Sequence, residues 1–141
     1  MPDRTRGLVD TNIIILEDLI DLSVLPTEMA ICAVTLAELT AGVHAVPDGA
    51  PDAAAERARR VALLQRVEAT FSPLPFDEAA ARVYGRIVAA TVGAGRTSRR
   101  RTADLFIAAV AGAHQLPLYT TNPSDFANLS EIVEVIAVPR P

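Results

Sequence analysis

Four acidic residues occupy positions where a carboxylate can do chemistry. They lie in the segments VDTN, TLAEL, ADLF and NPSDF, each beside an apolar run, and they are Asp10, Glu38, Asp104 and Asp125. Carboxylates that converge in a folded protein repel one another unless a proton or a cation neutralises them. Oxygen ligands of this kind suit hard divalent cations such as Mg²⁺ or Mn²⁺. If the four side chains meet, they form a candidate metal site.

The hydrophobic pattern places these acids at one edge of a sheet. Short β-branched apolar runs alternate with longer helical patterns, which predicts an α/β fold. We expect strands at residues 7–10, 30–34, 70–74, 116–120 and 132–138, and helices at 12–21, 35–46, 52–69, 77–93 and 102–114. The carboxyl ends of parallel strands open on a single edge, where ligands bind. Three of the acids follow expected strands and Asp104 begins a helix, so that edge is the predicted site.

Each acid also has a structural explanation that needs no metal. Asp10, or Asn12 beside it, is a suitable helix N-cap. Thr35 and Glu38 form the Thr-x-x-Glu pattern of a capping box. Asp104 in a first helical turn gains about 0.3–1 kcal/mol from the helix dipole. The fourth acid lies in the turn-forming sequence NPSD. Their joint placement favours a site, but for each acid alone both interpretations stay open.

Composition limits the remaining classes of protein. The chain has 141 residues, 50% of them hydrophobic, which suits one domain spanning residues 1–141. All 13 basic residues are arginine, so P-loop and pyridoxal enzymes, which need a lysine, are excluded. The apolar runs are shorter than the roughly 20 residues of a membrane span, and the first residues, MPDRTRG, lack a signal core. We therefore expect a cytoplasmic protein that does not enter the membrane.

Other polar residues are weaker candidates. Cys32 has no second cysteine to pair with and is expected in the core. His44 and His114 are isolated on helical patterns, which favours structural or surface roles. The net charge is −4, yet arginines cluster in GRTSRRR, at Arg96, Arg99, Arg100 and Arg101. A solvated loop and an RNA-contacting segment explain that cluster equally well.

In their order and spacing, the motifs resemble the PIN-domain ribonucleases, and among them the VapC-type toxins of bacterial toxin–antitoxin pairs. The resemblance rests on VDTNIII, TLAELTAG, LPFDEAAARVYGRI, ADLFIAAVA and TTNPSDF, which together span nearly the whole chain. It implies a PIN-like three-layer α/β/α sandwich around a central, mainly parallel sheet of about five strands. It also implies catalytic metal ligands at Asp10, Glu38, Asp104 and Asp125. Asn12 and Thr121 are expected to support them by hydrogen bonds to the carboxylates, and Asn122 is a further supporting residue. Whether Asn122 or Asp125 completes the ligand set stays open.

The resemblance further implies a function. It suggests a Mg²⁺-dependent endoribonuclease toxin, with Mn²⁺ as a substitute, that cuts structured RNA such as tRNA or rRNA and so inhibits translation and growth. A VapB-type antitoxin would neutralise it, and both a homodimer and a toxin–antitoxin complex are expected. Carboxylates neutralised by a metal ion attract a phosphate backbone despite the acidic composition, and the arginines of GRTSRRR can track the strand.

Competing classes can be compared residue by residue. A phosphatase of the haloacid dehalogenase type needs a second aspartate two residues after the first, and a later lysine. Asn12 occupies that position, and the chain has no lysine. A receiver domain fails for lack of the same lysine. A catalytically inactive PIN module that only binds RNA or a protein remains the alternative, although the presence of all four acids argues against it.

Overall fold

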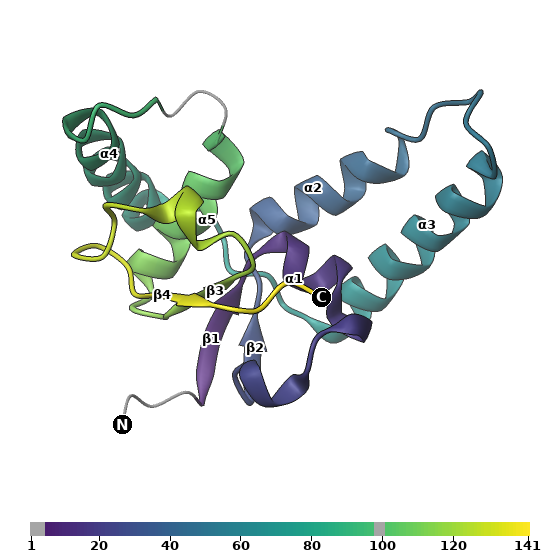
Figure 1. Cartoon of the computed structure of the whole chain (residues 1–141), viewed down its shortest axis with the longest axis horizontal. Helices are drawn as coiled ribbons and strands as arrows, with labels where there is room; N and C mark the ends of the chain where they lie inside the picture. The colour runs from purple at the N-terminus through teal and green to yellow at the C-terminus, as the bar shows by residue number, and fades with distance from the viewer. Residues whose placement is uncertain (1–4, 98–100) are drawn as a thin grey trace.

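A computed structural model of the chain describes residues 5–97 and 101–141. Within these residues, parallel strands form a sheet in the order β2-β1-β3-β4 (Figure 1). The strands are β1 (Arg6–Val9), β2 (Glu28–Ala30), β3 (Leu118–Thr120) and β4 (Val135–Ala137). The helices are α1 (Thr11–Ile15), α2 (Ala33–Val43), α3 (Ala53–Thr70), α4 (Glu78–Gly93) and α5 (Thr102–Ala113), with short 3₁₀ turns η1 (Glu17–Leu19), η2 (Leu22–Val24) and η4 (Pro123–Phe126). In the described ranges no helix combines the length and apolar character of a membrane span.

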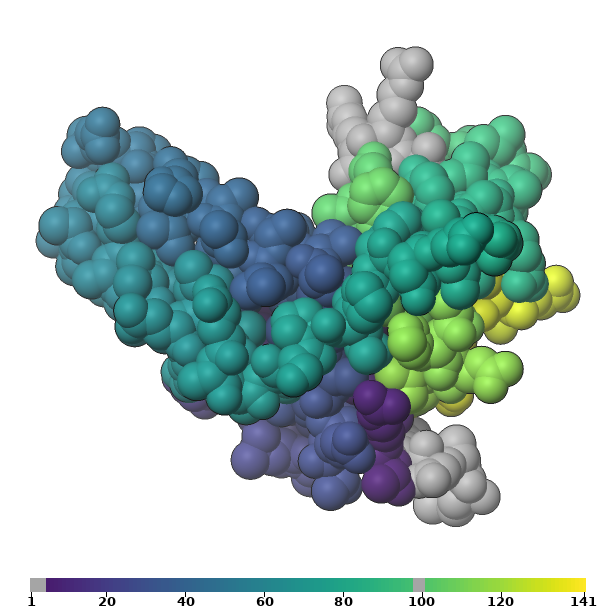
Figure 2. Space-filling model, turned by 180° about the vertical axis from the view of Figure 1, so that it is seen from behind, coloured from purple at the N-terminus to yellow at the C-terminus, as the bar shows by residue number. Residues whose placement is uncertain are grey.

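Helices cover both faces of this sheet. Successive residues of a strand point to opposite faces, and the buried residues divide accordingly. Leu8 and Leu118 pack in one core cluster with α4 and α5, while Val9 and Tyr119 pack in a second cluster with α1, α2 and α3. Seen from behind, α2 and α3 form an arm that stands apart from the α4–α5 side (Figure 2). The expected three-layer α/β/α architecture is confirmed.

The strand order creates a ligand-binding position between β1 and β3. From β1 the chain passes to β2 on one side, and it later crosses to β3 on the other side. In parallel α/β sheets, ligands bind beyond the carboxyl ends of the strands at the point where the order reverses in this way. Asp10 directly follows β1, and its backbone N–H donates to the Tyr119 carbonyl of β3 at 3.1 Å. The topology therefore brings Asp10 beside the end of β3.

The sheet differs from the expectation at residues 70–74. This segment forms only an isolated bridge, in which Leu74 pairs with Cys32. Pro73 and Pro75 flank Leu74 and have no N–H to donate, so the ladder cannot extend in either direction. The expected number of about five strands is close, since the described residues give a four-stranded sheet with this bridge beside it.

Several element boundaries also differ from the expectation. The strands expected at 116–120 and 132–138 are shorter, at Leu118–Thr120 and Val135–Ala137. The strand expected at 30–34 ends at Ala30, and residues 33–34 already belong to α2, because an apolar run such as MAICAV does not mark where a strand gives way to a helix. The helix expected at 12–21 ends at Ile15, and 3₁₀ turns follow it. As a result, Ile15, Leu19 and Leu22 are exposed by 53%, 69% and 68%. The other helices closely match the expected ranges.

Close packing between β1 and β3 requires glycine at position 7. A Cβ on Gly7 would collide with the ring of Tyr119, which is fully buried. We expect Gly7→Ala to lower the free energy of unfolding by about 1–2 kcal/mol, because the ring has no space to move into. Gly85→Ala in α4 is the control, since nothing lies within 4 Å of its Cβ, and it should gain about 0.5–1 kcal/mol. Urea denaturation measures both variants, and an undiminished stability of Gly7→Ala would contradict this packing.

Candidate metal centre

Asp10 is held by hydrogen bonds at the start of α1. Its Oδ1 accepts from the backbone N–H groups of Asn12 at 3.1 Å and Ile13 at 3.4 Å, so Asp10, not Asn12, is the N-cap of α1. The hydroxyl of Thr120 donates to Oδ2. A carboxylate offers about four lone-pair sites, and these three donors leave about one for a cation. The capping role is therefore confirmed, and it does not exclude a role as a metal ligand.

Burial makes the charge of Asp10 costly. Its side chain is nearly inaccessible to water, and this burial raises its pKa above the ordinary value for aspartate. The hydrogen bonds from Thr120, Ile13 and Asn12 oppose this rise, and the negative charge of Glu38 adds to it. The protein's own donors thus do not fully compensate the charge, whereas a bound cation would.

Asp104 is close enough to the other acids to be affected by all of them. Its pKa is raised to about 6, first by burial and then by the negative charges of Asp125, Asp10 and Glu38, while Arg101 lowers it. Exposed charges that are far apart are screened by water and salt, so this coupling requires proximity and partial burial. The structure therefore brings all four sequence-predicted acids around one region at the carboxyl edge of the sheet.

Thr11 of α1 positions Glu38 of α2. The Thr11 hydroxyl donates to Glu38 Oε1 at 2.6 Å, and its oxygen lies 3.0 Å from Thr35 Oγ1. The expected capping box is wrong, because Cys32 is the N-cap of α2 and Thr35 lies inside the helix, bonded to Thr11. Glu38 is consequently tied to α1, the helix that Asp10 caps.

Two arginines of the GRTSRRR cluster hold the turn that carries Asp125. Arg101 donates to the Asp125 carbonyl at 3.2 Å, and Arg96 donates to the Ser124 carbonyl at 3.1 Å. These bonds fix η4 beside the start of α5, where the charge of Asp125 raises the pKa of Asp104. The guanidinium groups therefore have a structural role, which sequence reasoning did not find.

Thr120 supports Asp10, and Thr121 does not. The Thr120 hydroxyl donates to Asp10 and accepts the backbone N–H of Asn122 at 3.0 Å. Thr121 Oγ1 is buried and has no hydrogen-bond partner among the described residues, so the expected bond from Thr121 to a carboxylate is wrong. The side chain of Asn122 accepts a hydrogen bond from Arg140 at 3.2 Å. Asn122 thus contacts the C-terminal tail, which leaves Asp125 better placed than Asn122 to join the acids.

The support that Thr120 gives can be measured. We expect Thr120→Val to lower the free energy of unfolding by about 1–2 kcal/mol at pH 8, because a charge-assisted hydrogen bond to buried Asp10 is lost. The loss should be smaller at pH 4, where the Asp10 carboxyl is protonated more often. Thr91→Val is the matched control, since buried Thr91 donates only to the Ile87 carbonyl of its own helix. If both variants depend on pH alike in urea titrations, Thr120 does not stabilise the Asp10 charge.

Other candidates lie away from the acids or outside the described residues. His44 and His114 are exposed C-caps of α2 and α5, which confirms the expected surface role. Cys32 is buried, as expected, and burial raises the pKa of its thiol. Arg99 and Arg100 lie outside the described residues.

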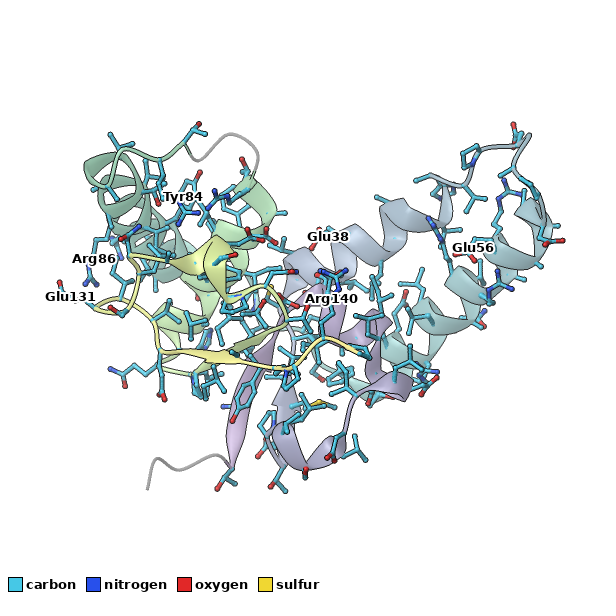
Figure 3. The ribbon with its side chains drawn as sticks, in the orientation of Figure 1. Glu38, Glu56, Tyr84, Arg86, Glu131 and Arg140 are labelled. Carbon is cyan, nitrogen blue, oxygen red and sulfur yellow. The ribbon has the colours of Figure 1, made fainter. Side chains whose placement is uncertain are left out.

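Three of the four sequence-predicted acids, without Asp125, border a cavity of about 690 Å³ between α1, α2 and α3. Asp10, Glu38 and Asp104 line it together with Asn12, and arginines of α3 line it as well. In Figure 3, Glu38 lies near the middle of the molecule, whereas Glu56, also part of the lining, lies far out on the α2–α3 arm. Sequence reasoning missed the α3 residues, because charged residues on an amphipathic helix look like an ordinary solvated face.

The acids fit a hard divalent cation chemically. Among residues 5–97 and 101–141, no group of three Asp, Glu, His or Cys side chains is yet arranged to hold an ion. The carboxylates around Asp104 raise its pKa because their negative charges repel one another. We therefore expect them to close around one point only when a cation neutralises that repulsion. The donor set consists of carboxylate oxygens, which suits Mg²⁺ or Mn²⁺ better than softer metals.

Comparisons with known proteins identify the family. The model of the PIN domain matches residues 8–132. The chain belongs to the PIN-domain family. This PIN domain is 39% identical over 137 residues to Ribonuclease VapC5 of Mycobacterium tuberculosis, a match that covers 94% of the chain and 95% of the relative. The resemblance to VapC-type PIN proteins expected from the motifs is thereby confirmed.

Solved structures agree with this assignment. The crystal structure of VapBC-5 from Mycobacterium tuberculosis, a member of the VapBC family of toxin–antitoxin systems, matches with a TM-score of 0.78 and 36% identity over 96% of this PIN domain and 99% of that chain. FitAcB from Neisseria gonorrhoeae matches with a TM-score of 0.66 and 29% identity, over 92% and 95% of the two chains.

Proposed function

We propose that this PIN domain is a VapC-type endoribonuclease that uses Mg²⁺, with Mn²⁺ as a substitute. The observation that carries the proposal is that Asp10, Glu38 and Asp104 line one cavity at the ligand-binding edge of the sheet, where the neighbouring negative charges add to burial in raising the pKa of Asp104. The relative named Ribonuclease VapC5, which shares 39% of its residues with this chain, supports the choice of RNA as substrate.

The chain's residues have distinct roles in this proposal. Asp10, Glu38, Asp104 and Asp125 would hold the ion, which when bound supplies an activated water and stabilises the charge that develops on the phosphate. Thr120 orients the Asp10 carboxylate and Thr11 orients that of Glu38. Asp104 must lose its proton before it can act as a ligand, so metal binding and cleavage should both strengthen as the pH rises through about 6.

The proposal includes protein partners. Several solved relatives are VapBC toxin–antitoxin structures, and we propose that a VapB-type antitoxin covers the cavity and so blocks RNA. Ile15 borders the cavity, and exposed Leu19 and Leu22 follow it along the chain. Exposed apolar side chains of this kind suit an amphipathic segment of a partner. By analogy with the family, the proposal extends to a cytoplasmic homodimer that cuts tRNA or rRNA and inhibits translation and growth.

One observation favours the alternative, an inactive PIN module that binds RNA or a protein. The acids of the described residues are not yet arranged as a ligand cluster. Cleavage by the purified protein separates the two functions. Protein freed of metal by a chelator is mixed with labelled tRNA and rRNA, and Mg²⁺ or Mn²⁺ is then titrated in. We expect fragments only when a divalent ion is added. RNA that is bound but never cut, at any concentration of either ion, would favour the inactive module.

A further inference from the structure

Arginines on one side of α3 line the same cavity as the acids. Arg59, Arg60 and Arg66 belong to its lining, together with Glu56, and this spacing follows one side of a helix. Val67, next to Arg66, is buried in the core cluster that includes residues of α1, whereas Glu56 lies on the outer part of the arm (Figure 3). Arg66 therefore stands at the α1 end of the cavity and Arg59 about 10 Å farther out along the helix axis.

These arginines differ in how strongly they are engaged. Arg60 donates to Glu56 at 2.9 Å and to the Gly42 carbonyl at 2.7 Å, so it joins α3 to α2. Arg59 is paired with Glu56 only, through an exposed contact. Within the described part of the chain, Arg66 has neither a hydrogen bond nor an ion pair, and its side chain is exposed. Of the arginines on the α3 side of the cavity, Arg66 is therefore the one most available to a ligand.

We propose that Arg66, assisted by Arg59, binds backbone phosphates of a single RNA strand that runs along α3 toward the acids. This inference rests on the proposed function and names the surface that guides its substrate. The cavity has carboxylates at one end, and its α3 wall carries the unpaired guanidinium group of Arg66 and the exposed one of Arg59, which is paired with Glu56. Among the described residues, this arrangement suits a ligand with several negative charges in a row, some held by arginine and one by a cation at the acids. Arginine binds phosphate through a planar, two-pronged contact, and a basic groove that tracks the backbone is the usual way to hold single strands.

The geometry favours the arginines of α3 over Arg96 and Arg101 for this role. Arg96 and Arg101 donate to carbonyls of the η4 turn, so their guanidinium groups are occupied by the fold. Among the residues that the structure describes, Arg66 has no such partner, and it borders the same cavity as Asp10 and Asp104. A strand held by α3 therefore has a direct route to the acids.

Binding of a labelled twelve-nucleotide oligouridylate, measured by fluorescence anisotropy, tests the proposal. The measurements use full-length protein carrying Asp104→Asn, so that the RNA is not cut. In that background, Arg66→Ala should weaken binding roughly fivefold to tenfold at low salt, and it should reduce the slope of log affinity against log salt by about 0.7, the loss of one phosphate contact. Arg86→Ala is the matched control, because Arg86 is also exposed and without a partner among the described residues but borders a different cavity, beside Pro117 and Glu134. It should leave both quantities unchanged.

Cleavage kinetics give a second readout. In the otherwise unaltered protein, Arg66→Ala should raise KM with little change in kcat, which is the signature of lost substrate binding away from the reacting bond. If Arg66→Ala and Arg86→Ala lose RNA affinity equally, the proposed site is wrong and RNA is attracted by overall charge. If Arg66→Ala binds RNA as tightly as the parent, the proposal is also wrong, and the α3 side of the cavity is better explained as a surface for a protein partner. If the parent binds RNA through Arg66 yet never cuts it, the proposed function fails and this site stands. If it binds no RNA, both fail.

Discussion

Asp104→Asn is expected to slow RNA cleavage at least about 100-fold while the protein stays folded. Asparagine keeps the shape of the side chain but removes the charge that the ion requires. Residues that only orient metal ligands cost about 10-fold to 100-fold when replaced, so loss of a ligand itself should cost more. Asp10→Asn is expected to have a similar effect, because Asp10 lies at the same edge of the sheet and contributes to the raised pKa of Asp104. Single-turnover rates at saturating RNA and Mg²⁺ measure both variants.

Asp18→Asn is the matched control for these variants. Asp18 also lines the cavity, but it is exposed and is not among the charges that raise the pKa of Asp104. Its replacement should change the rate by no more than about twofold. If Asp104→Asn cleaves RNA as fast as Asp18→Asn, Asp104 is not required for cleavage and the proposed metal site is wrong.

Without metal, the protein is expected to lose stability as the pH rises through about 6. The pKa of Asp104 rises from 3.8 to about 6 on folding, so the folded state binds the proton more tightly. The stabilisation that protonated Asp104 gives the folded state is fully present below pH 3.8, and it is lost as the pH rises through the folded-state pKa of about 6. Each pKa unit corresponds to about 1.4 kcal/mol, and with a discount for partial exposure we expect a loss of about 2 kcal/mol. The raised pKa of Asp10 acts in the same direction.

Urea denaturation between pH 4 and pH 8 in the presence of a chelator measures this loss. Asp104→Asn should show less of it and should be about 2 kcal/mol more stable than the parent at pH 8. Saturating Mg²⁺ should restore the stability of the parent, because an ion that binds only the folded state stabilises it. Asp21 and Glu56, whose pKa values are lowered by their hydrogen bonds, lose their contribution only in more acidic solution. A metal-free parent whose stability rises steadily from pH 5 to pH 8 would contradict the account.

The predicted effects of Asp104 on cleavage and on metal-free stability have opposite signs for the same physical reason. Carboxylates gathered for a cation destabilise the protein when the cation is absent, so a change that removes function should add stability. Such trade-offs are expected where a site gathers like charges for function.

The sequence predicted the acids better than the residues that hold them. Asp10 and Asp104 could be recognised because each stands beside a strongly apolar element whose type the pattern defines. Thr121 was expected to hydrogen-bond the carboxylates of the site, whereas the hydroxyl that does so is that of its neighbour Thr120, the last residue of β3. The pattern does not show which of the two threonines ends the strand, because element boundaries are its least certain part. The hydroxyl of Thr11 could not be assigned to Glu38 at all, since the two residues are 27 positions apart.

Local patterns misled where tertiary contacts prevailed. The Thr35–Glu38 pattern suggested a capping box, but in the fold both side chains form hydrogen bonds with the hydroxyl of Thr11 instead. Residues 70–74 were expected to form a strand as one of the short runs between helical patterns, but the prolines on either side of Leu74 limit its pairing to one bridge. The parallel sheet and its helices could be predicted because burial on both faces leaves a strong signal over many residues, whereas a single contact leaves none.

A crystal structure of the protein grown with Mn²⁺, with the ion located by its anomalous scattering, would show whether the acids share a metal ion. We expect an ion at the carboxyl edge of the sheet, between β1 and β3, with carboxylate oxygens of Asp10 and Asp104 about 2.0–2.3 Å away. Glu38 and Asp125 should contact the same ion, directly or through water. An ion bound elsewhere, or Asp10 and Asp104 remaining too far apart to share one at saturating Mn²⁺, would contradict the proposed metal site.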